Sequence, residues 1–405
     1  MAVVALFGYL NHRLIRLPDT IGITLIGLIV SIGLALLGSL EPTITRRATL
    51  IISRIDFPEV VFHGMLGLLL FAGSLHVNIA DLAKDKWLIL VLSTVGVVIS
   101  TAIVGTGFYY GAKFFSFALP FAYCLVFGAL ISPTDPIAVL GVLRRIGVSK
   151  SFETQLVAES LFNDGTGVVV FLTILGITTG IHDFSVRNVI LLLATEAIGG
   201  VAVGLALGAV GFLLLRGVDS YPVEILITLA MPTGGYGLAE TLHTSAPIAV
   251  VVMGLVVGNQ GKKFAMSEQT QQHLFAFWDL IDQILNLMLF GLIGLEVMTL
   301  SVSVKHLSAG LLAIPVVLLA RYISIGLPIL VMRRAREFNP HVVKILTWGG
   351  LRGAISVALA LSLPPFPGRD SVLAASYIVV IFSILVQALT VGPLIEALGR
   401  RSQMH

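Results

Sequence analysis

The chain has 405 residues, of which 57% are hydrophobic and 12% are charged, and its formal net charge is +3. Soluble proteins carry about 25% charged residues, so half that supply cannot build a water-facing surface. The composition excludes a multidomain soluble enzyme and indicates an integral membrane protein.

The charge distribution, the cysteine content and the first apolar run restrict the class of protein further. The positive charge is spread over short connections without interleaved aromatic residues, so nucleic-acid binding has no support. The single cysteine, Cys124, lies in an apolar run, which predicts a packed thiol. The first apolar run, 2–10, lacks a basic region before it and a cleavage site after it, so we expect a retained membrane helix rather than a signal peptide.

Apolar runs of about 20 residues, the length that crosses the hydrocarbon layer, recur along the whole chain. The runs predict thirteen spans, approximately 2–17, 21–38, 59–79, 87–111, 120–143, 155–178, 187–215, 222–240, 245–258, 276–298, 307–331, 342–363 and 372–397. The first is interrupted by polar residues, and the ninth has only 14 residues, which suits a short or buried helix. No alternating barrel pattern is present, so the predicted fold class is all-α integral membrane.

The lysines and arginines indicate the orientation. The odd-numbered connections and the C-terminal tail hold sixteen of the 25, the even-numbered connections hold seven, and Arg321 and Arg352 lie inside spans. By the positive-inside rule, the odd connections and the C-terminus are cytoplasmic and the N-terminus is outside.

Six spans, a linking seventh and six more permit an inverted repeat. Two interrupted segments occupy matching places in the halves: Ser132-Pro133-Thr134-Asp135-Pro136 in the fifth span and Gly349-Gly350-Leu351-Arg352-Gly353 in the twelfth. Broken helices in corresponding positions point to a transport site.

Ionisable residues at membrane depth cost about 2.5 to 3.5 kcal/mol each, so each one needs a function or a partner. The candidates are Asp135, Glu159, Asp164, Glu196, Glu240, Arg321 and Arg352. For Glu196 and Glu240 we expect packing or capping contacts, with Glu240 and Arg321 kept as secondary site candidates.

The sixth span holds the densest polar cluster, from Glu159 to Gly167. On a helix, Ser160 and Asp164 share one face, and Glu159 and Asn163 share a face rotated by about 100°. Alkali cations prefer oxygen ligands, and a buried carboxylate holds either a cation or a proton, so competition at Asp164 would be an exchange mechanism. The alternative is a structural polar contact between helices.

In the fifth span, Pro133 and Pro136 remove two backbone donors and disfavour helical geometry before them. The interruption frees carbonyls near Thr134, which is the third predicted ion ligand. We expect Asp135 to face the positive end of the half-helix that follows it and to neutralise helix dipoles. The alternative is a proline-kinked helix that binds no ion.

The two arginines inside spans need partners. We expect a structural ion pair between Arg352 and Glu159, and for Arg321 either a carboxylate or the exposed carbonyls of a broken helix.

The motif Thr134-Asp135-Pro136 followed by Glu159-Ser160-Leu161-Phe162-Asn163-Asp164 resembles the signature of monovalent cation:proton antiporters of the CPA1 branch, the NhaP-type and animal NHE-type sodium/proton exchangers. Gly349-Gly350-Leu351-Arg352-Gly353-Ala354 is similar to their late glycine-arginine motif. Weaker similarities lie at Ala239-Glu240, Phe277-Trp278 and Gly294-Leu295-Glu296. The likeness covers nearly the whole chain.

The resemblance implies an NhaA/NhaP-like fold and a homodimer whose ion-binding core moves like an elevator. Asp164, Ser160 and Thr134 would bind Na⁺, and Glu159 and Arg352 would form the internal ion pair. Asn163 would mark the electroneutral branch, because the electrogenic relatives have Asp there. Some archaeal members place an acidic residue in the third span, where this chain has Ala72.

The predicted division of the chain follows this scheme. Spans 1–3 and 8–10 would form the dimerisation scaffold, spans 4–6 and 11–13 the ion-binding core, and span 7 the link, with boundaries at 1–86, 87–180, 181–217, 218–300 and 301–405.

The sequence therefore predicts an antiporter, not an enzyme, that exchanges Na⁺ for H⁺, with Li⁺ or K⁺ as alternative cations and no cofactor. Rival functions are a K⁺/H⁺ antiporter of the same fold and a cation channel, which would need a continuous polar pathway. The sequence lacks the motifs of membrane hydrolases and a Walker A loop. Because the last span ends near the C-terminus, we expect no long regulatory tail and a bacterial or archaeal cytoplasmic membrane.

Overall fold

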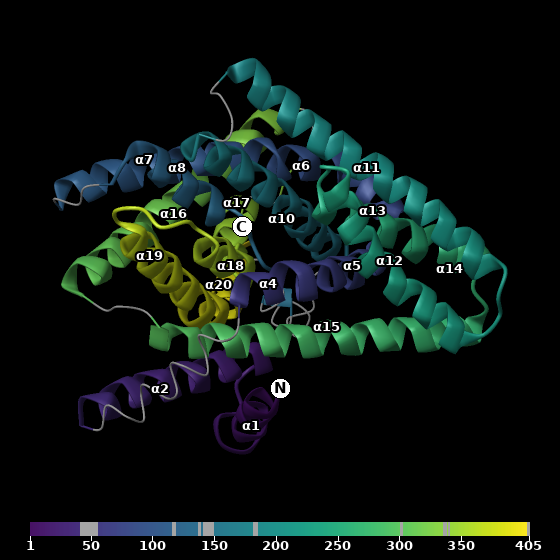
Figure 1. Cartoon of the computed structure of the whole chain (residues 1–405), viewed down its shortest axis with the longest axis horizontal. Helices are drawn as coiled ribbons and strands as arrows, with labels where there is room; N and C mark the ends of the chain where they lie inside the picture. The colour runs from purple at the N-terminus through teal and green to yellow at the C-terminus, as the bar shows by residue number, and fades with distance from the viewer. Residues whose placement is uncertain are drawn as a thin grey trace. The chain divides into compact units, whose positions relative to one another are not determined.

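The computed structural model describes residues 1–40, 56–115, 119–136, 139–140, 150–180, 185–299, 303–334, 338 and 341–402. The end of the predicted fifth span, 141–143, lies outside these residues. The described residues form helices and their connections, and the isolated bridge among them joins Asp135 to Leu351 (Figure 1). The all-α membrane fold class is confirmed.

The helices are α1 (Ala2–Leu10), α2 (Asp19–Leu40), α4 (Phe57–Glu59), α5 (Gly67–Leu75), α6 (Ile79–Ser93), α7 (Val95–Phe114), α8 (Phe121–Leu130), α10 (Lys150–Thr178), α11 (Val186–Arg216), α12 (Tyr221–Thr241), α13 (Ala246–Val256), α14 (Lys262–Phe264), α15 (Glu268–Glu296), α16 (Val304–Met332), α17 (Val342–Gly349), α18 (Ala354–Leu361), α19 (Arg369–Phe382) and α20 (Ala388–Ser402). Some of these helices are continued by π-helical segments: Asn11–Ile15, Val60–Leu66, Val257–Gly261 and Ser383–Gln387.

Each predicted span coincides with helical residues, but the boundaries and the count differ in detail. Eight helical stretches of the described chain are long and apolar enough to cross a membrane, and Ala2–Ile15 and Phe121–Leu130 are shorter apolar helices, so the number thirteen stays a prediction. The predicted span 87–111 belongs to a longer stretch that begins at Ile79, because the Asn78 side chain caps the helix by accepting from the backbone N–H of Ala80. Hydropathy locates only the apolar part of such a helix, so the predicted span omits the charged first turns of α6.

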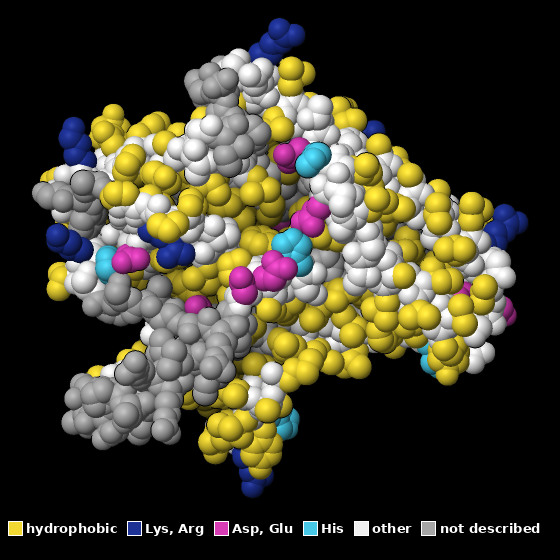
Figure 2. Space-filling model, in the orientation of Figure 1, with side chains coloured by type: hydrophobic (Ala, Val, Ile, Leu, Met, Phe, Trp, Pro, Cys, Tyr) yellow, Lys and Arg dark blue, Asp and Glu magenta, His cyan; other side chains and the backbone are white. Residues whose placement is uncertain are grey.

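The surface agrees with a lipid environment. Hydrophobic side chains are spread over the described part of the face shown in Figure 2, and charged side chains occur at few points on it. Helix α11 carries exposed apolar residues along its length, including Ile190, Ile198, Leu205 and Leu213. Such a surface is stable only when it is covered by lipid or protein.

Backbone contacts divide the chain into two compact units. The first comprises Met1–Val60, Val98–Val148 and Asn286–His405, and the second comprises Val61–Val97 and Ser149–Leu285. These units group helices by packing alone, so the predicted division into scaffold and core stays a prediction.

The second unit is built around α13, which packs against α5, α11 and α12 (Figure 1). Nine of its eleven residues are buried, as expected for the short ninth span. Ser245 caps the helix by accepting from the N–H of Ile248, and Pro247 lies in its first turn, where no partner for a backbone N–H is needed.

Glycines bring these helices close together. A Cβ added to Gly204 of α11 would lie 2.5 Å from the carbonyl oxygen of Ala249, and one added to Gly258 would lie 2.2 Å from that of Leu75. Both spacings require glycine, because real Cβ atoms are not found so near another atom. The glycines from 199 to 211 therefore serve close helix packing.

The first unit packs α16 against α19, with α17, α18 and α20 nearby (Figure 1). Gly310 of α16 faces Ile378 of α19, with 2.2 Å from its added Cβ to Cδ1 of Ile378. Helix α7 meets α8 through the rings of Phe108 and Phe127, whose centroids are 4.4 Å apart. These contacts hold the helices on either side of the two interrupted segments.

We predict that Gly258→Ala destabilises the protein by about 1 to 3 kcal/mol, because the methyl group would press on the Leu75 carbonyl. The matched control is Gly237→Ala in α12, whose added Cβ meets nothing within 4 Å. Thermal unfolding of the full chain in detergent measures both variants. Equal Tm values for the two would show that the π-helical segment after α13 packs less tightly against α5 than described.

Candidate functional site

The two interrupted helices of the first unit meet at their breaks. Helix α8 ends at Leu130 and α17 ends at Gly349, and in each case several non-helical residues follow. The backbone N–H of Asp135 donates to the carbonyl oxygen of Leu351 at 2.8 Å. The breaks therefore lie where the sequence predicted them and are joined by a backbone hydrogen bond.

Arg352 compensates the end of α8. Its Nη1 donates to the carbonyl oxygens of Ser132 and Pro133, the latter at 3.0 Å, and the residue is buried. The break leaves these carbonyls without helical partners, and the C-terminal end of a helix carries partial negative charge. The buried guanidinium of Arg352 supplies N–H donors to these carbonyls and places a positive charge beside the negative end of α8.

Asp135 compensates a different helix end. Gly353 is the N-cap of α18, and a Cβ added there would lie 2.5 Å from Oδ2 of Asp135. The carboxylate thus lies at the positive end of α18. The sequence predicted this dipole role but assigned it to the half-helix that follows Asp135, most of which lies outside the described residues.

Arg321 of α16 lies at the end of α17. A Cβ added to Gly350, the C-cap of α17, would lie 2.5 Å from Nε of Arg321, and Arg321 is buried. This position favours the second of the two expectations for Arg321, the exposed end of a broken helix.

A side-chain relay spans the break between α17 and α18. The backbone N–H of Arg352 donates to Ser383 Oγ at 2.8 Å, and Ser383 Oγ donates to Gln387 Oε1 at 2.8 Å. Gln387 Nε2 in turn donates to the carbonyl oxygen of Trp348 at 3.0 Å. The relay satisfies backbone groups on both sides of the break, which would otherwise be buried without partners.

The other break is tied to α7. Ser132 Oγ lies 2.7 Å from the carbonyl oxygen of Gly128 and 2.9 Å from Ser100 Oγ. Thr134, the predicted ion ligand, follows two residues later and is buried. Thr134 therefore lies on a buried segment that the hydrogen bond between Ser132 and Ser100 joins to α7.

The second unit contains the carboxylate motif on α10. Asn163 Nδ2 donates to Glu159 Oε1 at 3.1 Å, and both residues are buried. Ser160 and Asp164 lie one turn apart on the neighbouring face, with Ser160 buried and Asp164 partly buried. The helical spacing is therefore the one that the sequence predicted.

The remaining predicted site residues stand as follows. Thr134 belongs to the first unit, whereas Asp164 and Ser160 belong to the second, so their joint ion site stays a prediction. The same holds for the pair of Arg352 and Glu159.

Glu240, a secondary candidate, lies near the end of α12. Its Oε1 is 3.3 Å from His63 Nε2, and both side chains are about half exposed. This is a contact between helices α12 and the π-helical start of α5, in keeping with the packing role expected for Glu240.

Sequence reasoning missed Ser383 and Gln387. They are four residues apart in the predicted span 372–397, within the mostly apolar stretch 378–389. Two polar side chains at that spacing share one face of a membrane helix and need hydrogen-bond partners there. This spacing could have identified Ser383 and Gln387 from the sequence.

Two broken helices that meet inside a membrane protein, with charged side chains at their ends, are characteristic of a secondary transporter. Residues 2–397 match the sodium/hydrogen exchanger family, in its transmembrane region. The chain belongs to this family, and its resemblance to NhaP-type antiporters is confirmed.

Three relatives illustrate the match. The Na(+)/H(+) antiporter NhaP of Pseudomonas aeruginosa is 49% identical over 403 residues, covering 98% of this chain and 95% of the relative. The Na(+)/H(+) antiporter NhaH of Halobacillus dabanensis is 36% identical, with 96% and 93% covered. Among solved structures, the sodium proton antiporter MjNhaP1 of Methanocaldococcus jannaschii has a TM-score of 0.74 at 20% identity, with 98% and 96% covered, which shows a shared fold.

We predict that Ser383→Ala lowers stability by about 1 to 3 kcal/mol, because the buried N–H of Arg352 loses its acceptor. The control is Ser376→Ala in α19, a buried serine whose Oγ donates to the carbonyl of Val372 in the same helix. Thermal unfolding in detergent should show the larger loss of Tm for Ser383→Ala. The reverse order would mean that the relay does not support the break.

Proposed function

We propose that this protein is a secondary antiporter that exchanges Na⁺ for H⁺ across the cytoplasmic membrane by competition of the two ions at Asp164. The exchange runs in whichever direction the two gradients dictate. The proposal includes Ser160 and Thr134 as further oxygen ligands, and it needs no cofactor. The printed names of the relatives, which are Na(+)/H(+) antiporters, favour Na⁺ as the cation.

The observation that carries the proposal is the different environment of the two carboxylates on α10. Glu159 accepts a hydrogen bond from the Asn163 amide, which compensates its charge within the protein. Asp164 lies on the neighbouring face, one turn from the Ser160 hydroxyl. A carboxylate and a hydroxyl on one helix face form half of an oxygen site for a small hard cation, and protonation of that carboxylate would remove the site.

In the proposed cycle, Asn163 determines how many protons are exchanged for each Na⁺. The amide is neutral, so Asp164 alone changes its protonation during the cycle. An aspartate at position 163 would bring a second negative charge to Glu159, and two such carboxylates do not both ionise readily when they are buried together. We infer that one H⁺ moves for each Na⁺ and that the cycle is electroneutral.

The proposed orientation, with the N-terminus outside and the C-terminus cytoplasmic, rests on the distribution of lysine and arginine and on alternating crossings. Contacts in the second unit support the alternation. His76 at the end of α5 lies 3.1 Å from Asp279 in the first half of α15, and Tyr221 at the start of α12 stacks on His273. The start of the third span instead contacts the end of α12. Spans 8 and 10 are thus parallel to each other and antiparallel to span 3, as alternating crossings require.

The homodimer, the elevator movement and the division into scaffold and core belong to the same proposal. They are supported by the resemblance to the family. The breaks in α8 and α17 give the core a rigid centre that could move as one body, because the backbone groups on either side are already paired.

We predict that Asp164→Asn abolishes cation-dependent proton movement, because an amide cannot alternate between H⁺ and Na⁺. The measurement is proton efflux from vesicles that contain the full chain, with Na⁺, Li⁺ or K⁺ added. The matched control is Glu196→Gln in α11, a carboxylate within another candidate span, which should retain exchange.

Wild-type rates in Asp164→Asn would remove Asp164 from the mechanism. Na⁺ flux through the wild type without compensating H⁺ movement would indicate a channel. Larger responses to K⁺ than to Na⁺ would indicate a K⁺/H⁺ antiporter of the same fold.

We also predict that exchange in proteoliposomes is nearly independent of an imposed membrane potential, because no net charge crosses in a one-for-one cycle. Rates are compared at zero and at about 100 mV of either sign, where each net charge moved would gain or lose about 2.3 kcal/mol. A strong dependence on voltage would contradict the one-for-one stoichiometry.

A further inference from the structure

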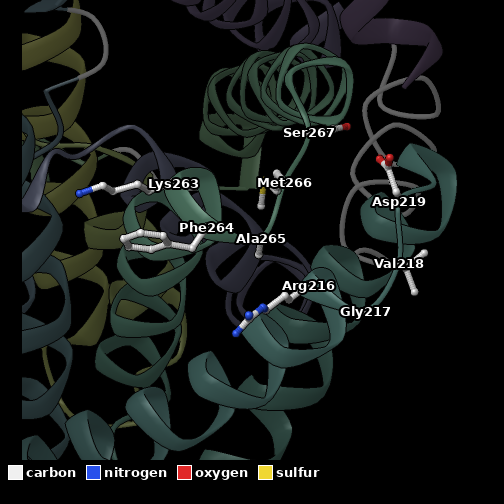
Figure 3. Close-up of a pocket in the computed structure, with 9 residues that line it drawn as sticks. All are labelled: Arg216, Gly217, Val218, Asp219, Lys263, Phe264, Ala265, Met266 and Ser267. Atoms are coloured by element: carbon white, nitrogen blue, oxygen red, sulfur yellow. The ribbon is translucent and has the colours of Figure 1, made fainter.

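A basic pocket lies in the second unit, and none of the residues that line it belongs to the proposed ion site. It has a volume of about 440 Å³ and lies between the end of α11 and the segment that joins α14 to α15 (Figure 3). Its lining includes Arg216, Lys263, Phe264 and Asp219. In Figure 3 the first three side chains extend toward one side of the view, and the Asp219 carboxylate lies on the other side.

Among the described residues, the two cations of the basic pocket, Arg216 and Lys263, have no acidic partner. Lys263 Nζ lies 5.0 Å from the centroid of the Phe264 ring. Both cations are exposed, so they are available to an anion from outside the protein.

The basic pocket lies where the membrane meets water. Arg216 is the last residue of the candidate span Arg187–Arg216, and the candidate span Glu268–Glu296 begins just after the pocket. Phe264 is 58% exposed, so its apolar ring is available to pack against a lipid. Leu213 and Leu214, in the last turn of α11, expose apolar surface that leads up to the pocket.

We propose that the basic pocket binds the headgroup phosphate of an anionic phospholipid, whose acyl chains lie along the exposed face of α11. Arg216 and Lys263 would contact the phosphate, and Phe264 would pack beside the glycerol region. Basic pockets at the ends of membrane helices on the cytoplasmic side bind anionic headgroups, and both connections here are cytoplasmic in the predicted orientation. The inference does not depend on the transport mechanism.

The test measures lipid binding to the purified full chain in detergent by native mass spectrometry. The probes are phosphatidylglycerol, phosphatidylcholine and inorganic phosphate. The wild type should bind phosphatidylglycerol in preference to phosphatidylcholine, and millimolar inorganic phosphate should not displace it, because phosphate alone lacks the contacts along α11.

The decisive variant is Arg216→Gln with Lys263→Gln. Each interfacial Lys or Arg contributes roughly a factor of five to the binding of an anionic lipid, so the double variant should bind phosphatidylglycerol about thirtyfold more weakly and each single variant about fivefold. The matched control, Arg333→Gln with Lys86→Gln, removes one arginine and one lysine from exposed positions elsewhere and should bind like the wild type.

Three results would overturn the proposal. Equal binding by the pocket variant and the control variant would mean that only overall charge matters. Equal affinity for phosphatidylcholine would exclude recognition of negative charge. Displacement of phosphatidylglycerol by inorganic phosphate would indicate a site for a soluble anion in place of a lipid.

Discussion

A helix that stops inside a membrane exposes backbone carbonyls or N–H groups and a partial charge at its end, and lipid cannot solvate either. The first unit contains two such interruptions, and the rest of its centre follows from the need to compensate them. Arg352 serves the end of α8, Asp135 the start of α18 and Arg321 the end of α17. Each of these polar side chains thus lies at a helix end that carries the opposite partial charge.

This arrangement also restricts the neighbouring residues. Gly350 and Gly353 leave room for Arg321 and Asp135, and a Cβ at either position would overlap the charged group. Prolines at the other break prevent helical hydrogen bonding, which leaves the carbonyls that Arg352 uses. The composition of both motifs is thus explained by backbone compensation, before any ion is considered.

Much of the architecture was predictable from the sequence, because span length, proline and glycine placement and buried charge each reflect one local requirement. The breaks, the buried ninth span and the shared helix face of Glu159 and Asn163 follow from such local rules. Contacts between distant segments do not. The sequence could not show that Asp135 serves α18 or that Gln387 reaches the Trp348 carbonyl, because hydropathy and spacing carry no information about which helix ends meet.

The π-helical segment Ser383–Gln387 joins α19 to α20, and it contains both members of the relay. A π-helical turn accommodates one residue more than an α-helical turn. Removing one residue would return the turn to α-helical hydrogen bonding and would change the four-residue spacing between Ser383 and Gln387. The support of the break therefore depends on the length of this turn, so the final helix would tolerate substitutions on its surface far better than a single-residue deletion between these two residues.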